Sequence, residues 1–288
     1  MILLCVVDHD IVNAVDPQFH QVGNKVVFLC RVDRVDQGSL FAPFDKVCII
    51  AGSLRQRDQL VKDPPLEIER TDSMFINYPN NPTAAIAPLS FYREVVDFAV
   101  DHNIVVVSDN PYSEVAFDGY KAPSFLEAKG AMEVGIEMHS LSKTYNMTGW
   151  RIGMAVGNAE ILSGLGRVKT NVDSGVFNAV QHAAIAALSG PQDCVKEACA
   201  IYQERRDVLV SGLRELGFEV PSPKATFYVW MPVKDCMSFT AKLLNEAGIV
   251  VTPGVGFGSA GEGYVRFAIT RPVERIREAI ERMRRLSL

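Results

Sequence analysis

The stretch Ile136–Gly153 reads IEMHSLSKTYNMTGWRIG, and the interpretation of this chain depends on it. An apolar strand, Ile136–His139, comes before a polar cluster that contains Lys143. Arg151 follows eight residues after that lysine, at the start of a second apolar strand, Ile152–Val156. In open α/β sheets, ligands bind beyond the carboxyl ends of the strands. The pattern therefore predicts both a fold class and the place where the chemistry should lie.

The preceding residues strengthen the prediction of an α/β fold. Met74–Tyr78 has the composition of a short strand, and Phe91–Ala99 repeats apolar residues at helical spacing. Ile104–Val107 is a continuous β-branched run, which is typical of a strand buried on both faces. Strands that alternate with helices indicate βαβ units. We therefore expect a mostly parallel sheet with helices on both faces.

The residues that follow predict a second, smaller domain. Ser189–Pro191 interrupts a long helical stretch, so we place the boundary there: 1–190 form a large domain and 191–288 a small α+β domain. We expect strands and helices beyond Asn158 at Ile161–Val168, Ala179–Leu188, Val195–Leu216, Thr226–Trp230, Phe239–Ala247, Ile249–Thr252, Tyr264–Ile269 and Val273–Leu286. Residues 1–70 carry weaker patterns, with strands expected only at Val26–Leu29 and Val47–Ala51.

The composition is that of a globular protein and excludes several function classes. Of 288 residues, 48% are hydrophobic and 22% charged, and the formal net charge is −5. This charge provides no field for nucleic acid or an anionic membrane, so neither partner is expected. No apolar run approaches the roughly 20 residues that span a bilayer, and we find no export signal. Six cysteines without metal-binding spacing suggest reduced, mostly buried thiols in the cytoplasm, and no metal.

Four polar groups follow or flank the predicted strands: Asn80–Thr83, Asp109–Tyr112, Ser140–Lys143 and Arg151. Each alone is typical of a turn, a helix N-cap or a solvated loop. Together they bring a carboxylate, a phenol, an amide, hydroxyls, a lysine and a guanidinium to one edge of a sheet. These groups suit a phosphorylated, nitrogen-containing aromatic aldehyde.

Three motifs resemble class I/II aminotransferases, which are fold-type I enzymes dependent on pyridoxal 5′-phosphate. They are Tyr78–Thr83 (YPNNPT), Ser108–Ser113 (SDNPYS) and Ser140–Gly153 (SLSKTYNMTGWRIG). The resemblance extends from about Met74 to the C-terminus. Within the family, the chain is most similar to the LL-diaminopimelate aminotransferases and then to aspartate/alanine-type enzymes.

The resemblance implies a role for each matching residue. Lys143 would bind the cofactor covalently and then move the α-proton, and it must be partly neutral near pH 7 to do so. Asp109 would pair with the pyridine nitrogen and keep it protonated. Asn81 and Tyr112 would hydrogen-bond the 3′ oxygen of the ring. The catalytic residues implied are thus Lys143, Asp109 and Tyr112.

The resemblance also implies residues that bind the phosphate and the substrate. Arg151, with the hydroxyls of Ser140 and Ser142, would hold the cofactor phosphate. Arg266 would bind the substrate α-carboxylate, together with Asn81. Phe19, in a segment similar to a family Asp-Pro-x-Tyr stretch, would stack on the cofactor, although a core phenylalanine is the alternative.

The chain departs from the family pattern in two places. Ala84 replaces the glycine that usually follows Asn-Pro-Thr, which costs most if this position needs a positive φ. Residues 1–70 look shortened or rebuilt, and Ala51–Leu54 only superficially fits the family's phosphate-binding turn. We interpret Gly256–Gly261, a literal GxGxxG, as a loop because a strand follows it. We interpret His139 as structural.

The expected activity is transamination between an amino acid and a 2-oxo acid. The most specific hypothesis is an LL-diaminopimelate:2-oxoglutarate aminotransferase of lysine biosynthesis, acting as a homodimer. An aspartate/alanine-type aminotransferase, a pyridoxal-phosphate β-lyase and a truncated non-catalytic paralogue remain as alternatives.

Overall fold

The computed structural model describes residues 18–22, 25–29, 48–51, 73–173 and 175–286. The contacts divide the chain into two compact units. Unit 1 runs to Tyr78 and also contains 87–111 and 123–191. Unit 2 consists of 79–86, 112–122 and 192–288. No helix in the described ranges is both long enough and apolar enough to cross a bilayer.

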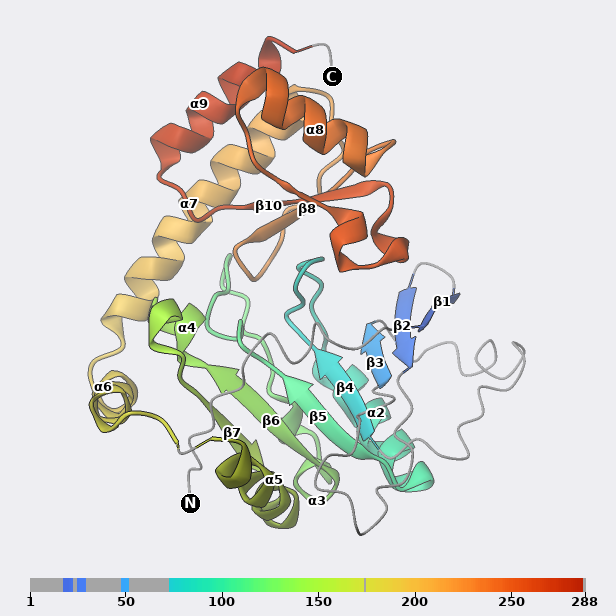
Figure 1. The fold of residues 1–288 in the computed structure, drawn as a ribbon, viewed down its shortest axis with the longest axis vertical. Coiled ribbons are helices and arrows are strands. Elements are labelled where there is room, and N and C mark those ends of the chain that lie inside the picture. The colour runs from blue at the N-terminus through green and yellow to red at the C-terminus, as the bar shows by residue number, and fades with distance from the viewer. Residues whose placement is uncertain (1–17, 23–24, 30–47, 52–72, 174, 287–288) are drawn as a thin grey trace. The chain divides into compact units, whose positions relative to one another are not determined.

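Unit 1 contains a seven-stranded sheet whose strands follow one another in sequence order, from β1 to β7 (Figure 1). The strands are β1 Gln18–Val22, β2 Lys25–Leu29, β3 Cys48–Ala51, β4 Ser73–Asn77, β5 Val105–Asp109, β6 Gly135–Ser140 and β7 Gly153–Gly157. The four strands β3 to β6 pair in parallel, whereas β1–β2, β2–β3 and β6–β7 pair antiparallel. The sheet is therefore parallel in its middle and antiparallel at both edges.

The inner strand β5 is covered on both faces, as its β-branched sequence predicts. Val106, Val107 and Ser108 are consecutive and all buried. Because successive side chains in a strand point to opposite faces, consecutive buried residues require cover on both sides. The α/β class is confirmed at this strand.

Helices cover the sheet of unit 1. Helix α2 (Leu89–His102) buries Phe91, Val95 and Ala99 at helical spacing, in one core with residues of β4 and β5. The other helical segments of the unit are η3 Phe125–Glu127, α3 Ala131–Val134, α4 Leu141–Thr144, η4 Thr148–Trp150, α5 Ala159–Val172 and α6 Asn178–Ser189. Of these, α4 carries Lys143.

Unit 2 has its own sheet and its own core. Its elements are α7 Asp193–Glu215, β8 Tyr228–Pro232, α8 Cys236–Ala247, β9 Thr252–Pro253, η5 Gly254–Phe257, η6 Ser259–Gly261, β10 Tyr264–Ala268 and α9 Val273–Arg284. The three strands are antiparallel in the order β8-β10-β9. One face of this sheet packs in a core with residues of α7, α8 and α9, and it contributes Val229, Val265 and Phe267.

The segment 112–122 belongs to unit 2 although it lies early in the chain. Ala116 forms an isolated antiparallel bridge with Ala225. The carboxylate of Asp118 binds both terminal nitrogens of Arg206 at 2.6 and 2.9 Å, and Arg206 is itself buried. The predicted boundary near residue 190 assigns this segment and 79–86 to the large domain, whereas the contacts group them with unit 2. As a division into domains, the boundary stays a prediction.

Several local expectations differ from the structure. The strand expected at Ile249–Thr252 is reduced to two residues, Thr252–Pro253, and β1 was not predicted. Two short 3₁₀ helices occupy the glycine-rich stretch 256–261, and a strand follows them, so it starts no α-helix. Of the described cysteines, Cys236 is buried but Cys194 is exposed, so "mostly buried" was wrong for this part of the chain. Residues 52–54 of the proposed glycine turn lie outside the described residues.

Ala84 has a positive φ of 56°, in the left-handed region that favours glycine. It ends a turn in which Asn80 Oδ1 accepts hydrogen bonds from the Thr83 backbone N–H at 3.1 Å and from its hydroxyl at 2.7 Å. The Asn80 carbonyl also accepts the Ala84 N–H at 2.9 Å. The departure from the family's glycine therefore has a backbone cost, because Cβ crowds the following carbonyl in this conformation.

We expect Ala84→Gly to raise the free energy of unfolding by about 1 kcal/mol, since it relieves this crowding. Urea unfolding measures the change. The matched control is Ala186→Gly, at an exposed position inside α6. There the same substitution should lower stability by about 1 kcal/mol, because glycine is a poor helix former. Destabilisation by Ala84→Gly would contradict the strain argument.

Candidate active site

Lys143 lies in the four-residue helix α4, which begins directly after β6. Ser140 caps this helix, because its Oγ accepts the Ser142 N–H at 3.2 Å. Leu141 and Ser142 are buried, while Lys143 is half-buried. The end of a sheet strand and a capped turn thus fix the backbone of the lysine.

Arg151 comes to the same edge of the sheet because β7 runs antiparallel to β6. Ser140 pairs with Gly153, so the residues just before β7 lie beside the end of β6. Arg151 is exposed and has a φ of 51°, and its Nη1 donates to the Thr148 carbonyl at 3.4 Å. A non-glycine residue in this region stores strain, which proteins retain mainly at functional sites.

Asp109 ends β5, and a neighbouring strand holds its carboxylate. Asn77 is its register partner in β4. The Asn77 side-chain Nδ2 donates to Asp109 Oδ2 at 3.0 Å and to the Asp109 carbonyl at 2.8 Å. This double contact orients the carboxylate along the sheet edge.

The three predicted charged groups of unit 1 interact electrostatically. Burial raises the pKa of Asp109 to about 6, and the positive charges of Lys143 and His139 oppose this rise. Burial also lowers the pKa of Lys143 from its usual value, the charge of Arg151 lowers it further, and Asp109 opposes the change. For both groups the main cause is desolvation, which disfavours the charged form of a side chain.

A buried glutamate holds His139. Glu137 Oε1 lies 2.9 Å from His139 Nε2 and accepts the Ser124 hydroxyl at 2.8 Å. Its Oε2 accepts the Phe125 N–H at 2.8 Å and the Ser108 hydroxyl at 3.1 Å. Burial alone would raise the pKa of Glu137, but the hydrogen bonds and the charge of His139 lower it. This network fits the structural interpretation of His139, which also lies close enough to Asp109 to influence the pKa of that carboxyl.

Three other predicted residues, Asn81, Tyr112 and Arg266, lie in unit 2. Asn81 Oδ1 accepts a hydrogen bond from Arg266 Nη1 at 2.5 Å, across 185 positions of sequence. The buried Tyr112 places its hydroxyl 3.4 Å from the hydroxyl of Tyr228. The structure thus joins Asn81 to Arg266 and Tyr112 to Tyr228 within one unit. Phe19 lies in β1 opposite Phe28, where the structure describes only the backbone pairing.

The sequence analysis missed two residues of these clusters. Asn77 lies inside the predicted strand Met74–Tyr78, and Tyr228 lies inside the predicted strand Thr226–Trp230. The predicted strand ends, Tyr78 and Val107, do not lead to the observed pairing of Asn77 with Asp109. No sequence signal leads to Tyr228, because its contact with Tyr112 spans 116 positions.

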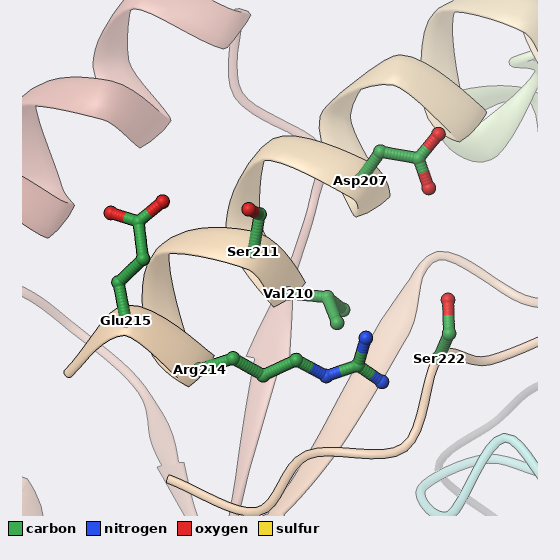
Figure 2. Close-up of a pocket in the computed structure, with 6 residues that line it drawn as sticks. All are labelled: Asp207, Val210, Ser211, Arg214, Glu215 and Ser222. Atoms are coloured by element: carbon green, nitrogen blue, oxygen red, sulfur yellow. The ribbon is translucent and has the colours of Figure 1, made fainter. Parts of the chain in front are cut away.

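A separate hollow of about 430 Å³ lies beside the second half of α7. Figure 2 shows its lining, which is Asp207, Val210, Ser211, Arg214, Glu215 and Ser222. Its charged groups already have partners: Asp207 pairs with Arg206, Arg214 donates to the Val220 carbonyl, and Glu215 pairs with Arg284. None of the predicted site residues lines this hollow, and we assign it no role in the chemistry.

Comparison with known proteins identifies relatives across most of the chain. A family model described as aminotransferase class I and II matches residues 52–283. The LL-diaminopimelate aminotransferase of Desulforudis audaxviator (strain MP104C) is 56% identical over 224 residues, covering 77% of this chain and 57% of that protein. The enzyme of the same name from Syntrophobacter fumaroxidans (strain DSM 10017 / MPOB) is 58% identical over 221 residues, or 76% and 57%. The chain therefore spans less than two thirds of the length of these relatives.

Solved structures agree with these sequence matches. Apo-BacF from Bacillus subtilis superimposes with a TM-score of 0.75 at 41% identity, covering 80% of this chain and 62% of that one. A probable N-succinyldiaminopimelate aminotransferase from Thermus thermophilus gives a TM-score of 0.73 at 36% identity, covering 78% and 61%.

The raised pKa of Asp109 leads to a prediction about the stability of the cofactor-free protein. A carboxyl with a pKa of about 6 when folded, against an ordinary value of 3.8, binds more protons in the folded state. Its contribution to stability therefore falls as pH rises from about 4 to about 6. We expect Asp109→Asn to increase the free energy of unfolding at pH 8 by on the order of 2 kcal/mol. The gain should shrink as the pH is lowered to 5.

The control for this experiment is Asp235→Asn, which should change stability in the opposite direction. Asp235 caps α8, and hydrogen bonds from the Ser238 backbone and side chain lower its pKa. Its ionised form is thus favoured by folding, so its replacement should reduce stability at neutral pH. Urea unfolding at several pH values measures both variants. A pH-independent effect at Asp109 would show that its ionisation is not disfavoured by burial.

Proposed function

Because the chain belongs to the class I and II aminotransferase family, we propose that it moves an amino group between an amino acid and a 2-oxo acid. The proposed cofactor is pyridoxal 5′-phosphate. The observation that carries this proposal is the electrostatic coupling of Lys143 with both Asp109 and Arg151 in unit 1. Lys143 is close enough to a buried carboxylate and to a guanidinium for both charges to act on it, and these two groups suit the two ends of such a cofactor.

The chemistry of these side chains fits the cofactor. Burial disfavours the ionised form of Asp109, and a cationic partner stabilises that form. A protonated ring nitrogen would be such a partner. Arg151 is a planar donor suited to phosphate, and Ser140 and Ser142 add hydroxyls beside it. In this proposal Asn81 and Tyr112 bind the ring 3′ oxygen, and Phe19 stacks on the ring.

The bound cofactor supplies an electron sink for the negative charge left on a substrate carbon. Lys143 would move the α-proton: burial and the charge of Arg151 lower the pKa of its amine, which favours the neutral form that can accept a proton. Asp109 would pair with the ring nitrogen and keep it protonated. Overall, the donor amino acid leaves as a 2-oxo acid, and the acceptor 2-oxo acid leaves as an amino acid.

We assign Arg266 to the substrate α-carboxylate, with Asn81 as its partner. Guanidinium groups bind carboxylates through two parallel hydrogen bonds, which fix orientation as well as charge. The hydrogen bond from Arg266 to Asn81 already orients the guanidinium.

The proposed substrates are LL-diaminopimelate and 2-oxoglutarate, in lysine biosynthesis. The support is the 56% and 58% identity to proteins named LL-diaminopimelate aminotransferase. We also propose a cytoplasmic location, which agrees with the free thiols of Cys194, Cys199 and Cys236.

We further propose a homodimer, supported by exposed apolar residues in α5 and in the residues that follow it. Helix α5 has apolar residues at helical spacing but buries none of them. Val168, Val172 and Phe177 are exposed by 57%, 69% and 75%. Apolar side chains gathered in this way mark interaction sites, and residues 170–178 are the segment we expect to approach the partner's site.

Lys143→Ala should abolish transamination and covalent attachment of the cofactor. After incubation with pyridoxal 5′-phosphate and reduction with borohydride, the unchanged protein should retain the cofactor on a peptide that contains Lys143. The variant should retain none. Absorbance spectra and peptide mass spectrometry measure this outcome, and amino-acid and 2-oxo-acid products are quantified in parallel.

Other products would point to other activities. Release of ammonia and pyruvate would indicate a β-lyase and contradict the proposed transamination. A protein whose absorbance does not change with the cofactor would indicate a non-catalytic paralogue. A faster reaction with aspartate or alanine than with LL-diaminopimelate would overturn the proposed substrate.

Replacing both Val172 and Phe177 by aspartate should shift the protein from dimer to monomer, because two charges would be buried at the proposed interface. Light scattering measures the molar mass. The control is Val100→Asp, on α2, where the valine is similarly exposed at 58%. A monomeric unchanged protein, or an equal shift by the control, would contradict the assignment of this surface.

A further inference from the structure

The guanidinium of Arg266 lies between two aromatic rings of unit 2. Its Cζ is 4.1 Å from the ring centroid of Tyr228 and 4.5 Å from that of Phe257. Both distances are within the range in which a cation is attracted to the face of a ring. Arg266 is half-buried, so the two rings replace part of the water that a guanidinium would otherwise bind.

The strand register explains how these groups meet. Arg266 pairs with Trp230 of β8 and with Thr252 of β9, while Tyr228 is two residues before Trp230. Residues two apart in a strand share a face, so Tyr228 and Arg266 stand on the same face of the sheet. The 3₁₀ turn η5 follows β9 and brings Phe257 to the arginine.

The position of Tyr228 is fixed from two sides. Its backbone N–H donates to the Thr226 hydroxyl at 3.2 Å, and its own hydroxyl lies 3.4 Å from that of Tyr112. Thr226 is fully buried and has a φ of 69°, which is an outlier for a β-branched residue. Such strain persists only when the surrounding structure imposes it.

The hydrogen bonds of Arg266 leave one edge of the guanidinium available. Nη1 donates to Asn81 at 2.5 Å, and Nη2 makes only a long contact of 3.5 Å with Thr252 Oγ1. Nε is buried and has no hydrogen-bond partner among the described residues. Nε and Nη2 form the side edge of the group, which can donate two parallel hydrogen bonds to one carboxylate.

We propose that Tyr228 and Phe257 are positioning residues that hold the Arg266 guanidinium between their rings, with its Nε–Nη2 edge presented to a substrate carboxylate. This inference rests on the proposed role of Arg266 in carboxylate binding. An arginine side chain has several rotatable bonds, and holding it in one plane removes the entropy cost of ordering it at the moment of binding. Phe257 lies in the glycine-rich loop that the sequence analysis left without a function.

The test measures carboxylate binding directly, with succinate as the probe, because succinate has neither an amino nor an oxo group to react. Its dissociation constant is determined for the holoenzyme and for Tyr228→Leu, Phe257→Leu and Tyr228→Phe. Loss of either ring should weaken succinate binding about 5- to 10-fold, from the strength of a partly buried cation–π contact. Tyr228→Phe keeps the ring and should stay within about 2-fold of the unchanged protein.

The matched control is Tyr264→Leu. Tyr264 lies on β10 two residues before Arg266 and stacks on Trp230, with ring centroids 5.2 Å apart. This substitution removes an aromatic ring from the same face of the sheet but leaves both rings that contact Arg266 in place. Succinate binding should therefore be unchanged. Thermal unfolding of every variant shows which ones are folded, and either leucine variant alone is sufficient for the comparison.

In steady-state assays the two leucine variants should raise KM for 2-oxoglutarate more than they lower kcat, because they weaken carboxylate binding. Unchanged succinate affinity in a folded Tyr228→Leu or Phe257→Leu protein would overturn the inference. So would equal weakening by Tyr264→Leu, or an unchanged protein that does not bind succinate. If only Tyr228→Leu and Phe257→Leu weaken succinate binding, and the protein has no transaminase activity, the positioning role of Tyr228 and Phe257 is supported. Only the proposed function is then overturned.

Discussion

The mutual charge interaction of Lys143 and Asp109 is the constraint on which the rest of unit 1 depends. Burial raises the pKa of Asp109 and lowers the pKa of Lys143, and the charge of each group limits the shift of the other. The charge of Lys143 therefore offsets only part of the cost of burying Asp109. The register of the strands provides this arrangement, since Asn77 of β4 pairs with Asp109 of β5 and Ser140 of β6 pairs with Gly153 of β7.

Unit 2 assembles its polar groups by a different means. No helix or parallel strand end positions Arg266; instead an antiparallel sheet face, two aromatic rings and one asparagine hold it. The segment that carries Tyr112 is tied to this unit by backbone pairing and by the ion pair of Asp118 with the buried Arg206. Breaking this pair would leave the buried charge of Arg206 with Asp207 as its remaining carboxylate partner. The anchoring of Tyr112 therefore depends on residues that have no part in the chemistry.

Three of the six non-glycine residues with positive φ in the described part of the chain lie near groups assigned to function. Ala84, Arg151 and Thr226 all have positive φ values, and each lies within a few residues of a proposed binding group. At Arg151 and Thr226 a glycine would relieve the strain but remove the guanidinium or the hydroxyl that the site uses. At Ala84 no side-chain function compensates, and the alanine is a departure from the family's glycine with a cost only in stability.

The sequence by itself determined the α/β class and most strands and helices, because local spacing and strand ends carry this information. From the same strand ends it predicted that Lys143, Asp109 and Arg151 lie at one edge of the sheet. It could not determine that β7 runs antiparallel to β6, or that Ala84 has a positive φ, since both depend on how the connecting turns close. Only the tertiary structure showed that Asn81 binds Arg266 and that Tyr228 joins Tyr112 to the arginine. The contacts of Asn81 with Arg266 and of Tyr112 with Tyr228 join residues more than a hundred positions apart. No periodicity within a segment encodes which distant side chain will fill the space beside it.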